Sequence, residues 1–367
     1  RPHTRSMSEE EVSYFRRALL EWAAQTPRPM PWKGEKDPYK IWLSEVILQQ
    51  TRVEQGMPYY EKFVKSYPDA RALAGAPEDE VLKMWEGLGY YSRARNLLQT
   101  ARHIASDRNG IFPDSYEDIR SLKGVGDYTA AAIASFAFNL PYPVVDGNVY
   151  RVLARFFALD AVTDLSSSKK LFASMAGRLL DPDRPGAFNQ AIMDFGALCC
   201  TPAQPDCGNC PLRQRCQALA KGTPTDYPVR LKKTAKKERF ILFLIVRRGG
   251  KTLVRKRTGK DIWKGLYEFP CIETTSAKEL LETDTSTIFP KGVPEGVSLG
   301  KPSDLCRQTL SHREITAVFR ELLLPEDIPP GLFQDGIFSD CTETEIAGLK
   351  KNFAFPVVIS GFLKKFV

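Results

Sequence analysis

The first 220 residues carry apolar side chains at intervals of three and four, the spacing that puts them on one face of an α-helix. Proline and glycine interrupt the pattern repeatedly, so it divides into separate helices. Helices are predicted over residues 10–25, 41–50, 58–67, 78–85, 92–106 and 129–138. Because nothing before residue 238 has the pattern of a strand, this part of the chain is predicted to be all-α.

The pattern changes after residue 221. Residues 222–237 are poor in apolar side chains and rich in Lys and Arg, which indicates a basic linker. Beyond it, two apolar runs flank Gly249 and Gly250 and predict two strands around a turn. The other predicted elements are a helix at 277–283, a strand at 315–324 and a helix or strand at 355–366. The second domain, 238–367, is therefore predicted to be α+β.

Length, charge and composition narrow the range of functions. A chain of 367 residues exceeds what one hydrophobic core usually supports, which favours two domains. The net charge of +8 indicates a polyanionic partner. The three histidines, His3, His103 and His312, are scattered, so acid–base chemistry must fall mainly to carboxylates, Tyr or Lys. The N-terminus has no secretory signal and the longest apolar run, 240–246, is too short to cross a bilayer, so a cytosolic protein is expected.

Five of the eight cysteines lie between residues 199 and 216. This segment is rich in Pro, Gly and polar residues and offers little core in which free cysteines could be buried. Ligation by Cys alone suits an iron–sulfur cluster or zinc, and a single CxxC with long flanking spacers matches structural zinc poorly. Cys199 is expected to pack. The spacing of Cys200, Cys207, Cys210 and Cys216 resembles the [4Fe-4S] loop of the endonuclease III/MutY family of DNA glycosylases.

Two motifs in the middle of the chain add to this resemblance. Gly124 and Gly126 allow positive φ in a turn between a short helix and an alanine-rich one, where backbone N–H groups can approach a phosphate. Alone, this GxG motif could be an ordinary helix–helix turn. Asp146 follows about twenty residues later and precedes an apolar helix, where it could act as an N-cap and stay ionised. Together, the hairpin and Asp146 resemble the signature of the helix–hairpin–helix glycosylase superfamily.

Similarity to the MutY-type adenine glycosylases covers nearly the whole first domain. It implies that Glu45 is the general acid at adenine N7 and that Asp146 stabilises an oxocarbenium-like sugar or forms a covalent intermediate. From the residues alone, Glu45 on its apolar helix is either salt-bridged at the rim or protonated by desolvation, and the salt bridge is favoured; the resemblance reverses that preference. Tyr128 and Asn148 are implied to orient Asp146 and the nucleophile. Tyr128 stands where bifunctional relatives carry a Schiff-base Lys, so little or no AP lyase activity is expected.

The same resemblance implies further contacts, although packing at helix ends is an alternative for those near the DNA. Lys33 stands where Arg is frequent in the family, which puts a contact from this position in doubt. The implied DNA and lesion contacts are Gln50, Thr51, Leu88, Tyr90, Gly124 and Gly126, and those to adenine are Trp32 and Gln190.

The second domain resembles the Nudix-like C-terminal domain of MutY through residues 265–270 (GLYEFP). It lacks the carboxylate array with which Nudix hydrolases hold Mg²⁺, which favours binding over hydrolysis. Leu310, Ser311 and His312 match the family's Phe-Ser-His recognition loop, with Leu in place of Phe. Ser311 and His312 are therefore expected to contact 8-oxoguanine, although His312 could simply be a turn residue.

The expected architecture is a helical glycosylase domain, the basic linker 222–237 and the Nudix-like domain 238–367. The helical domain, 8–221, is expected to combine a six-helix module near 31–138 with an iron–sulfur module made of 8–30 and 139–221. The expected activity is base excision repair by a monomer, in the nucleoid region of a bacterial cytoplasm, on double-stranded DNA with 8-oxoguanine:A or G:A mispairs. The alternatives are a G:T mismatch thymine glycosylase and a non-catalytic iron–sulfur protein that binds DNA or senses redox state.

Overall fold

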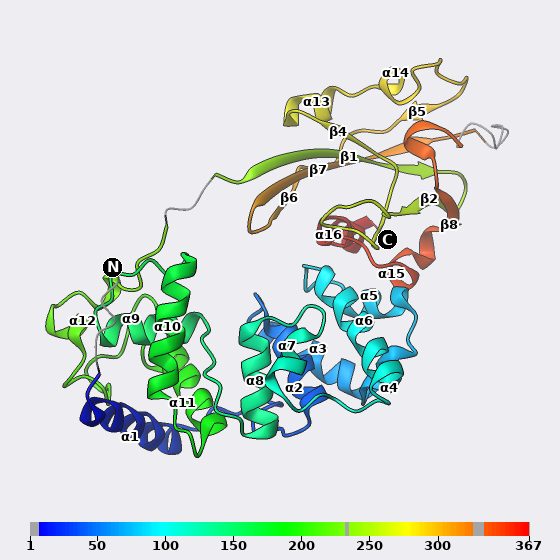
Figure 1. The fold of residues 1–367 in the computed structure, drawn as a ribbon. Coiled ribbons are helices and arrows are strands. Elements are labelled where there is room, and N and C mark those ends of the chain that lie inside the picture. The colour runs from blue at the N-terminus through cyan, green and yellow to red at the C-terminus, as the bar shows by residue number, and fades with distance from the viewer. Residues whose placement is uncertain (1–6, 232–234, 326–333, 367) are drawn as a thin grey trace. The chain divides into compact units, whose positions relative to one another are not determined.

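The computed structural model describes residues 7–231, 235–325 and 334–366, which form two compact units (Figure 1). The helical unit contains the described residues up to Gly75 and those from Gln99 to Leu231. The mixed unit contains Ala76–Leu98 and the described residues from Ala235 onward. Lys232 and Lys233 of the predicted linker, like His3, lie outside the described residues.

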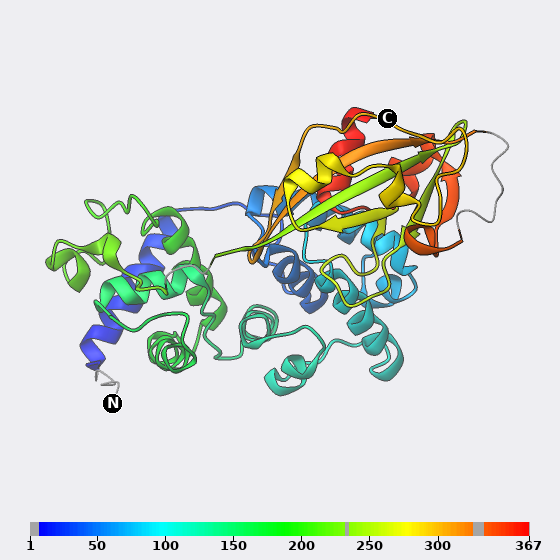
Figure 2. The ribbon, with the colours of Figure 1, turned by 90° about the horizontal axis from the view of Figure 1, so that it is seen from above.

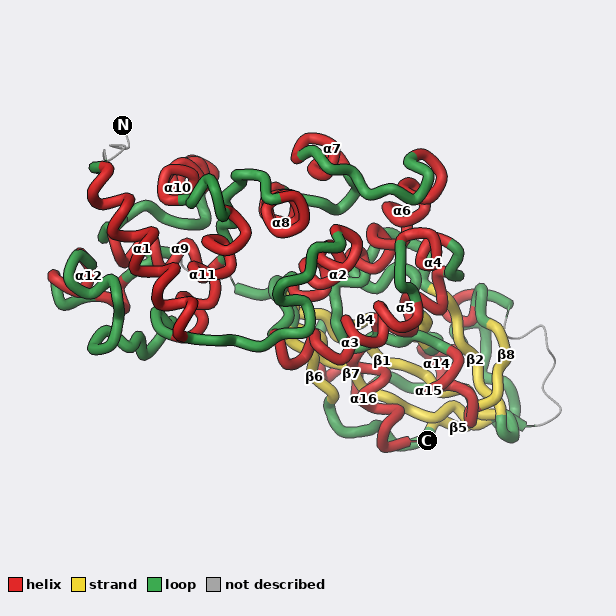
Figure 3. Tube along the Cα trace, turned by 90° about the horizontal axis from the view of Figure 1, so that it is seen from below, coloured by secondary structure: helices red, strands yellow, loops and turns green. Residues whose placement is uncertain are grey.

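Helices and loops make up the described chain before Lys237, as predicted, and the strands drawn yellow in Figure 3 all come later. The prediction began one helix at Pro58, but α3 starts five residues earlier and runs through this proline. None of the described helices combines the length and apolar character needed to span a membrane. The helices of this region are α1 (Glu9–Gln25), α2 (Pro38–Leu48), α3 (Val53–Ser66), α4 (Ala70–Ala74), α5 (Glu78–Trp85), α6 (Ser92–Asp107), α7 (Tyr116–Ser121), α8 (Asp127–Phe138), α9 (Gly147–Phe156), α10 (Ser166–Leu179), α11 (Pro185–Leu198), α12 (Gln217–Ala220) and the 3₁₀ turn η1 (Pro224–Asp226).

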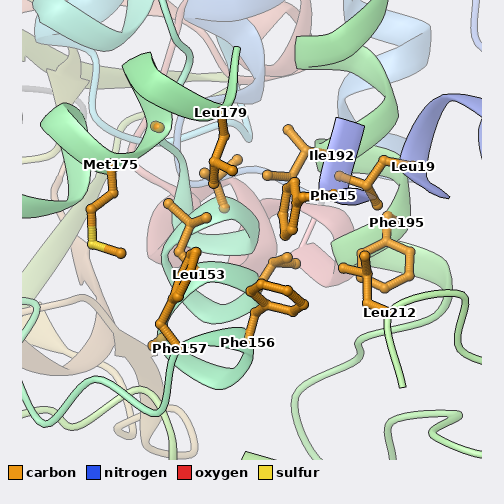
Figure 4. Close-up of a cluster of buried hydrophobic side chains, with 14 of the residues drawn as sticks. Phe15, Leu19, Leu153, Phe156, Phe157, Met175, Leu179, Ile192, Phe195 and Leu212 are labelled. Carbon is orange, nitrogen blue, oxygen red and sulfur yellow. The ribbon is translucent and has the colours of Figure 1, made fainter. Parts of the chain in front are cut away.

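A hydrophobic core joins α1 to the helices that follow residue 146 (Figure 4). Phe15 of α1 is fully buried and meets Phe156 of α9 edge-on, with ring centroids 5.0 Å apart. Its ring also lies 6.4 Å from that of Phe188 on α11. Burying aromatic rings of this size supplies much of the stability of such a core. It also fixes α9 and α11 against each other, and these are the helices that carry Asp146 and Gln190.

The mixed unit is built around two long parallel strands, β1 (Lys237–Arg247) and β7 (Arg313–Leu323), which run side by side (Figure 2). Alternate residues of β1 pack on opposite sides of the sheet, which explains its unbroken apolar run. Leu242 and Leu244 belong to a cluster with Leu280 of α13 (Ala277–Glu282).

Helices cover both faces of this sheet, α13 and α14 (Thr285–Ile288) on one and α16 (Val357–Phe366) on the other (Figure 1). On the α16 side, Phe319 stacks on Phe362 at 4.0 Å. β1 and β7 lie in a five-stranded sheet of order β4-β1-β7-β5, with β6 also paired to β7, and a separate sheet has the order β3-β2-β8. The remaining elements are β2 (Lys251–Lys256), β3 (Tyr267–Glu268), β4 (Cys271–Thr274), β5 (Ser298–Leu299), β6 (Cys306–Thr309), η3 (Gly336–Phe338), β8 (Thr342–Glu345), η4 (Ile346–Gly348) and α15 (Leu349–Asn352).

The α+β prediction for this part of the chain is confirmed. The two strands around Gly249, which has φ 59°, the helix α13 and the strand β7 all lie where they were predicted. The segment left open between helix and strand is the helix α16. The short strands β3, β4, β5, β6 and β8 have no apolar alternation long enough to reveal them.

Candidate functional site

A cavity of about 450 Å³ lies in the helical unit, bounded by α2, α8, α11 and the start of α9. Its volume is within the range of small-molecule sites. A second hollow, of about 1170 Å³, shares Glu45, Tyr128 and Asp146 with it and continues to Gly124 and Gly126. The first cavity is lined by every residue that the sequence assigned to catalysis or to the adenine pocket: Trp32, Glu45, Tyr128, Asp146, Asn148 and Gln190.

Glu45 is the most unusual group in this cavity. It lies on α2 among apolar residues, only 7% exposed, and its Oε2 has no hydrogen-bond partner among the described residues. Burial disfavours the charged form and raises the pKa of Glu45 to about 7, against the lowering effect of a hydrogen bond with Tyr128. No described cation forms a salt bridge with it. The structure therefore favours protonation by desolvation over the salt bridge at the rim.

Tyr128 lies on the first turn of α8, between the two carboxyl groups. Burial raises the pKa of its phenol well above the ordinary value, and the charges of Glu45 and Asp146 raise it further. The phenol therefore keeps its proton and is available as a hydrogen-bond donor. A Schiff base needs an amine, and the phenol of Tyr128 cannot form one.

Asp146 is the N-cap of α9, as its position before an apolar helix suggested. Its Oδ1 accepts the Val149 backbone N–H at 2.8 Å, and its Oδ2 accepts the Asn148 side-chain amide at 3.0 Å. Burial nevertheless raises the pKa of Asp146, and the hydrogen bonds from Val149 and Asn148 oppose that rise. The start of α9 therefore does not by itself set the pKa of Asp146, because desolvation opposes its effect.

A chain of hydrogen bonds, which the sequence did not reveal, holds Asn148 in place. Arg151 donates from Nη2 to the Asn148 Oδ1 at 2.8 Å and to the Gly196 carbonyl at 2.6 Å, and from Nε to the Cys200 carbonyl at 2.7 Å. A Cβ at Gly196 would lie 2.7 Å from the Cβ of Asn148. Glycine at this position thus lets α11 approach the start of α9, and Arg151 connects that start to the cysteine loop.

The predicted hairpin between α7 and α8 is present, with one correction. Gly124 has φ 80°, whereas Gly126 has φ −91° and is the N-cap of α8. Positive φ is thus required only at Gly124. A Cβ at Gly126 would meet no atom within 4 Å, so the glycine leaves open space in front of the first N–H groups of α8.

Comparisons with known proteins agree with this geometry. Residues 43–175 match the family model of the HhH-GPD superfamily base excision DNA repair proteins, and residues 241–365 match that of the NUDIX domain. An adenine DNA glycosylase of Buchnera aphidicola subsp. Schizaphis graminum is 37% identical over 266 residues, which are 72% of this chain and 76% of that protein. The chain belongs to the adenine DNA glycosylase family.

Other members of the adenine DNA glycosylase family match over comparable lengths. That of Schizosaccharomyces pombe is 30% identical over 80% of this chain and 76% of its own length. The match to the Arabidopsis thaliana member is 36% identical and covers 72% of this chain, but it spans only 48% of that longer protein.

Solved structures resemble the helical part of this adenine DNA glycosylase family member. A thermostable thymine-DNA glycosylase superposes with a TM-score of 0.54 and 30% identity, covering 58% of this chain and 98% of its own. An endonuclease III–DNA complex superposes with a TM-score of 0.51 at 20% identity, which shows a shared fold. Both cover only part of the present chain.

The predicted DNA and lesion residues fall into both units of this adenine DNA glycosylase family member. Gln50 and Thr51 belong to the helical unit, and Thr51 lines the cavity. Leu88 and Tyr90 belong to the mixed unit, where the Tyr90 hydroxyl forms a hydrogen bond with that of Ser311. Gln50 and Tyr90 both have positive φ, 57° and 47°, which is uncommon outside glycine and often marks a functional loop.

Ser311 and His312 form the tip of the hairpin between β6 and β7. The Leu310 N–H donates to the Arg313 carbonyl at 2.8 Å and closes the turn, so both side chains are exposed to solvent. Leu88, by contrast, is 7% exposed.

The cysteine loop packs against the core of the helical unit. Cys199 is buried in that core, as expected, and shares a hydrogen bond with Cys210. Burial raises the pKa of the thiols of Cys200, Cys207 and Cys216, and the nearby charge of Cys210 raises it further. The described residues nevertheless contain no group of three or more His, Cys, Asp or Glu arranged to hold a metal ion.

Two residues of the site, Arg28 and Asp194, were not predicted. Asp194 is a buried carboxylate on the apolar helix α11, and Arg28 donates a hydrogen bond to it. The sequence contains a signal for Asp194, because it is a single carboxylate on an otherwise apolar helix, as Glu45 is.

The raised pKa of Glu45 makes folding depend on pH. Below its ordinary pKa of about 4.5 the carboxyl group is protonated in both folded and unfolded chains, so its burial costs little. As the pH rises towards 7, only the unfolded chain loses the proton freely, and stability is lost. Glu45→Gln cannot ionise, so between about pH 5 and pH 8 it should gain about 3 kcal/mol in unfolding free energy relative to the wild type.

Denaturant unfolding of both proteins at several pH values measures this difference. Glu54→Gln, at an exposed position of α3, is the control and should show no such gain. A difference between Glu45→Gln and wild type that stays constant with pH would contradict the desolvation of Glu45.

Proposed function

We propose that this chain is a monofunctional DNA glycosylase that excises adenine mispaired with 8-oxoguanine or guanine during base excision repair. One observation carries the proposal: a buried carboxyl group with a raised pKa and an N-capping carboxylate line the same cavity. Two carboxyl groups in different environments suit the cleavage of a glycosidic bond, where one donates a proton and the other stabilises positive charge. The family membership supports adenine as the base.

In the proposed reaction the adenine leaves the duplex and enters the cavity. Glu45 gives its proton to N7, the bond between C1′ and N9 breaks, and its electron pair stays with the base. Asp146 stabilises the positive sugar, either through its charge or by bonding to C1′. Water then bonds to C1′, which breaks any bond between C1′ and Asp146, and gives up a proton to the carboxylate that Glu45 has become. Tyr128 and Asn148 orient Asp146 and the water.

The reaction should stop after base release. Strand cleavage by the superfamily's lyases needs an amine that forms a Schiff base with the sugar. Tyr128 occupies the position on α8 where that amine would have to stand, and Lys123 forms its hydrogen bond with Gln99 instead.

Double-stranded DNA is the proposed partner, bound mainly through its phosphates. Gly124, Gly126 and the first N–H groups of α8 would approach one phosphate, and the net charge of +8 would attract others. Gln50, Thr51, Leu88 and Tyr90 would contact the opened duplex, and Trp32 and Gln190 the adenine. Endonuclease III, whose fold the helical part shares, has been solved in complex with DNA.

Cys200, Cys207, Cys210 and Cys216 are the proposed ligands of a [4Fe-4S] cluster. The chemistry of the donors fits, because all four are thiols and Cys200, Cys207 and Cys216 lie near Cys210. The Arg155 side chain lies beside the Cys200 sulfur at 3.5 Å. A cluster bound by four protein thiolates would shape this loop rather than react with substrate. The loop also carries Arg213 and Arg215, which could then face phosphates.

The proposed domains are a helical glycosylase domain at 8–221, a linker at 222–237 and a Nudix-like domain at 238–367. The exposed tip of the β6–β7 hairpin suits the last of these to lesion recognition, with Ser311 and His312 reading 8-oxoguanine. Relatives in Buchnera support a bacterial setting, in which a monomer would act in the cytoplasm at the nucleoid.

Thymine excision from G:T mismatches is the second candidate, because the solved thymine-DNA glycosylase resembles the helical part of this chain. That protein is covered over 98% of its length by only 58% of this chain, so the two proteins do not share the whole of the present chain, which also carries the NUDIX match at 241–365. Adenine excision accounts better for this additional domain, which would recognise the base opposite the adenine.

Asp146→Asn tests the proposed chemistry. Asparagine caps helices as well as aspartate does, so the fold should persist while the charge is lost. Adenine release under single-turnover conditions should fall by at least about 10³-fold, while duplex binding remains. The assay compares 8-oxoguanine:A, G:A, G:T and undamaged duplexes.

Asp160→Asn, at an exposed position, is the control and should keep the wild-type rate. Retained turnover in Asp146→Asn, or faster release of thymine than adenine by the wild type, would refute the proposal.

His312→Ala tests lesion recognition. Loss of a contact specific to 8-oxoguanine should lower the ratio of adenine excision opposite 8-oxoguanine to that opposite guanine by roughly fivefold to tenfold. His103→Ala, which removes an exposed histidine on α6, should leave the ratio unchanged. Equal losses opposite both bases would count against a recognition role for the hairpin tip.

Cys210→Ser tests the cluster. Protein purified without oxygen should contain about four iron atoms and equivalent sulfide per wild-type chain, and Cys210→Ser should lose most of both. Cys271→Ser, in the mixed unit, should keep them. Zinc in place of iron, or equal iron in both variants, would exclude this ligand set.

A further inference from the structure

Asp194 is a buried carboxylate that the proposed chemistry leaves without a role. It lies on α11, one turn after Gln190, and is 2% exposed. Its Oδ1 accepts hydrogen bonds from Gln190 Nε2 at 3.0 Å and Arg28 Nη1 at 3.1 Å, and its Oδ2 accepts one from Lys33 Nζ at 2.9 Å. All three donors line the cavity that contains Glu45, so Asp194 organises one side of that cavity.

Asp194 determines which end of the Gln190 amide faces the cavity. An ionised carboxylate accepts hydrogen bonds and donates none, so its neighbour must present the NH₂ group. Turning the amide over would place the Gln190 carbonyl oxygen against the carboxylate oxygen, a contact between two acceptors. With Nε2 engaged by Asp194, Oε1 at the other end of the amide is available to a molecule in the cavity that Gln190 lines.

Arg28 and Lys33 stabilise the charged form of Asp194. A buried carboxylate without a partner would destabilise the fold, whereas two cations at about 3 Å compensate its charge. They approach from the segment that precedes α2, while Gln190 approaches from its own helix. The carboxylate is thus held from several directions, so the single hydrogen bond that orients the Gln190 amide is made to a fixed acceptor.

We propose that Asp194 is a positioning residue that makes Gln190 a hydrogen-bond acceptor and so selects purines with an amino group at C6 over those with a carbonyl group there. A 6-amino group donates and a 6-carbonyl group accepts. Facing the Gln190 Oε1, only the former forms a hydrogen bond, and the latter leaves two buried acceptors unpaired. The inference rests on the proposed function, because it takes the base in this cavity to be a purine.

The test compares single-turnover excision of adenine and of hypoxanthine, its 6-oxo counterpart, from otherwise identical duplexes. In Asp194→Asn the side chain keeps its size but can both donate and accept, so Gln190 is free to turn over. The ratio of adenine to hypoxanthine excision should fall by at least about tenfold. A purely structural role for Asp194 would lower both rates equally and leave the ratio unchanged.

Gln190→Leu removes the acceptor while leaving Asp194 with both cations, and it keeps the inference testable if Asp194→Asn does not fold. Its ratio should fall to the same extent, and adding Asp194→Asn to it should cause no further fall, since the two residues act through one contact. Asp181→Asn is the matched control, because Asp181 is another buried aspartate of the helical unit with an arginine partner. Its ratio should equal that of the wild type.

The outcomes separate the inference from the function on which it rests. An unchanged ratio in Asp194→Asn or in Gln190→Leu, with adenine still excised by the wild type, overturns the role of Asp194 and leaves the proposed function intact. Failure of the wild type to excise adenine overturns the proposed function itself.

Discussion

The burial of Glu45 is the constraint on which the rest of the site depends. A carboxyl group with one unpaired oxygen and no salt bridge to a described cation can stay on an apolar helix only because it holds its proton near neutral pH. This requires α2, α8 and α9 to close around it, so that it is only slightly exposed at the wall of the cavity. The aromatic core that joins α1, α9 and α11 fixes part of that closure, and the close approach of α11 to α9 at Gly196 fixes another.

Three carboxyl groups of the helical unit show how surroundings assign different chemistry to similar side chains. Glu45 has no salt bridge to a described cation and a raised pKa. Asp146 is partly buried, which raises its pKa, but a backbone N–H and the Asn148 amide favour its charged form. Asp194 has two cations and an amide, and these hold it as a fixed acceptor. Only at Glu45 does no hydrogen bond from a described backbone N–H, amide or cation favour the charged form, so the proposed roles of acid, stabiliser and positioning group follow from the neighbours of each carboxyl group and not from its own chemistry.

Much of the fold could be predicted from the sequence, because long amphipathic helices and a fully buried strand leave strong periodic signals. Short polar strands such as β6 and β8 left none, since their residues depend on pairing with a long neighbour rather than on their own pattern. The start of α3 differs from the prediction because a proline usually marks the first turn of a helix, whereas Pro58 lies inside α3. Gly126 was misjudged for a similar reason, since the sequence shows that a glycine is present but not which φ it adopts.

The sequence by itself determined the residue types of the site and the cysteine spacing, because these depend on chemical identity and order along the chain. By itself it favoured a salt bridge for Glu45, which the described residues do not form, and it assigned Arg28, Arg151 and Asp194 no role. Only the tertiary structure decided these points. Desolvation and hydrogen bonding depend on which atoms surround a group. Tyr128 and Asp146 beside Glu45, and Arg28 and Lys33 beside Asp194, come from segments more than eighty residues away in the chain.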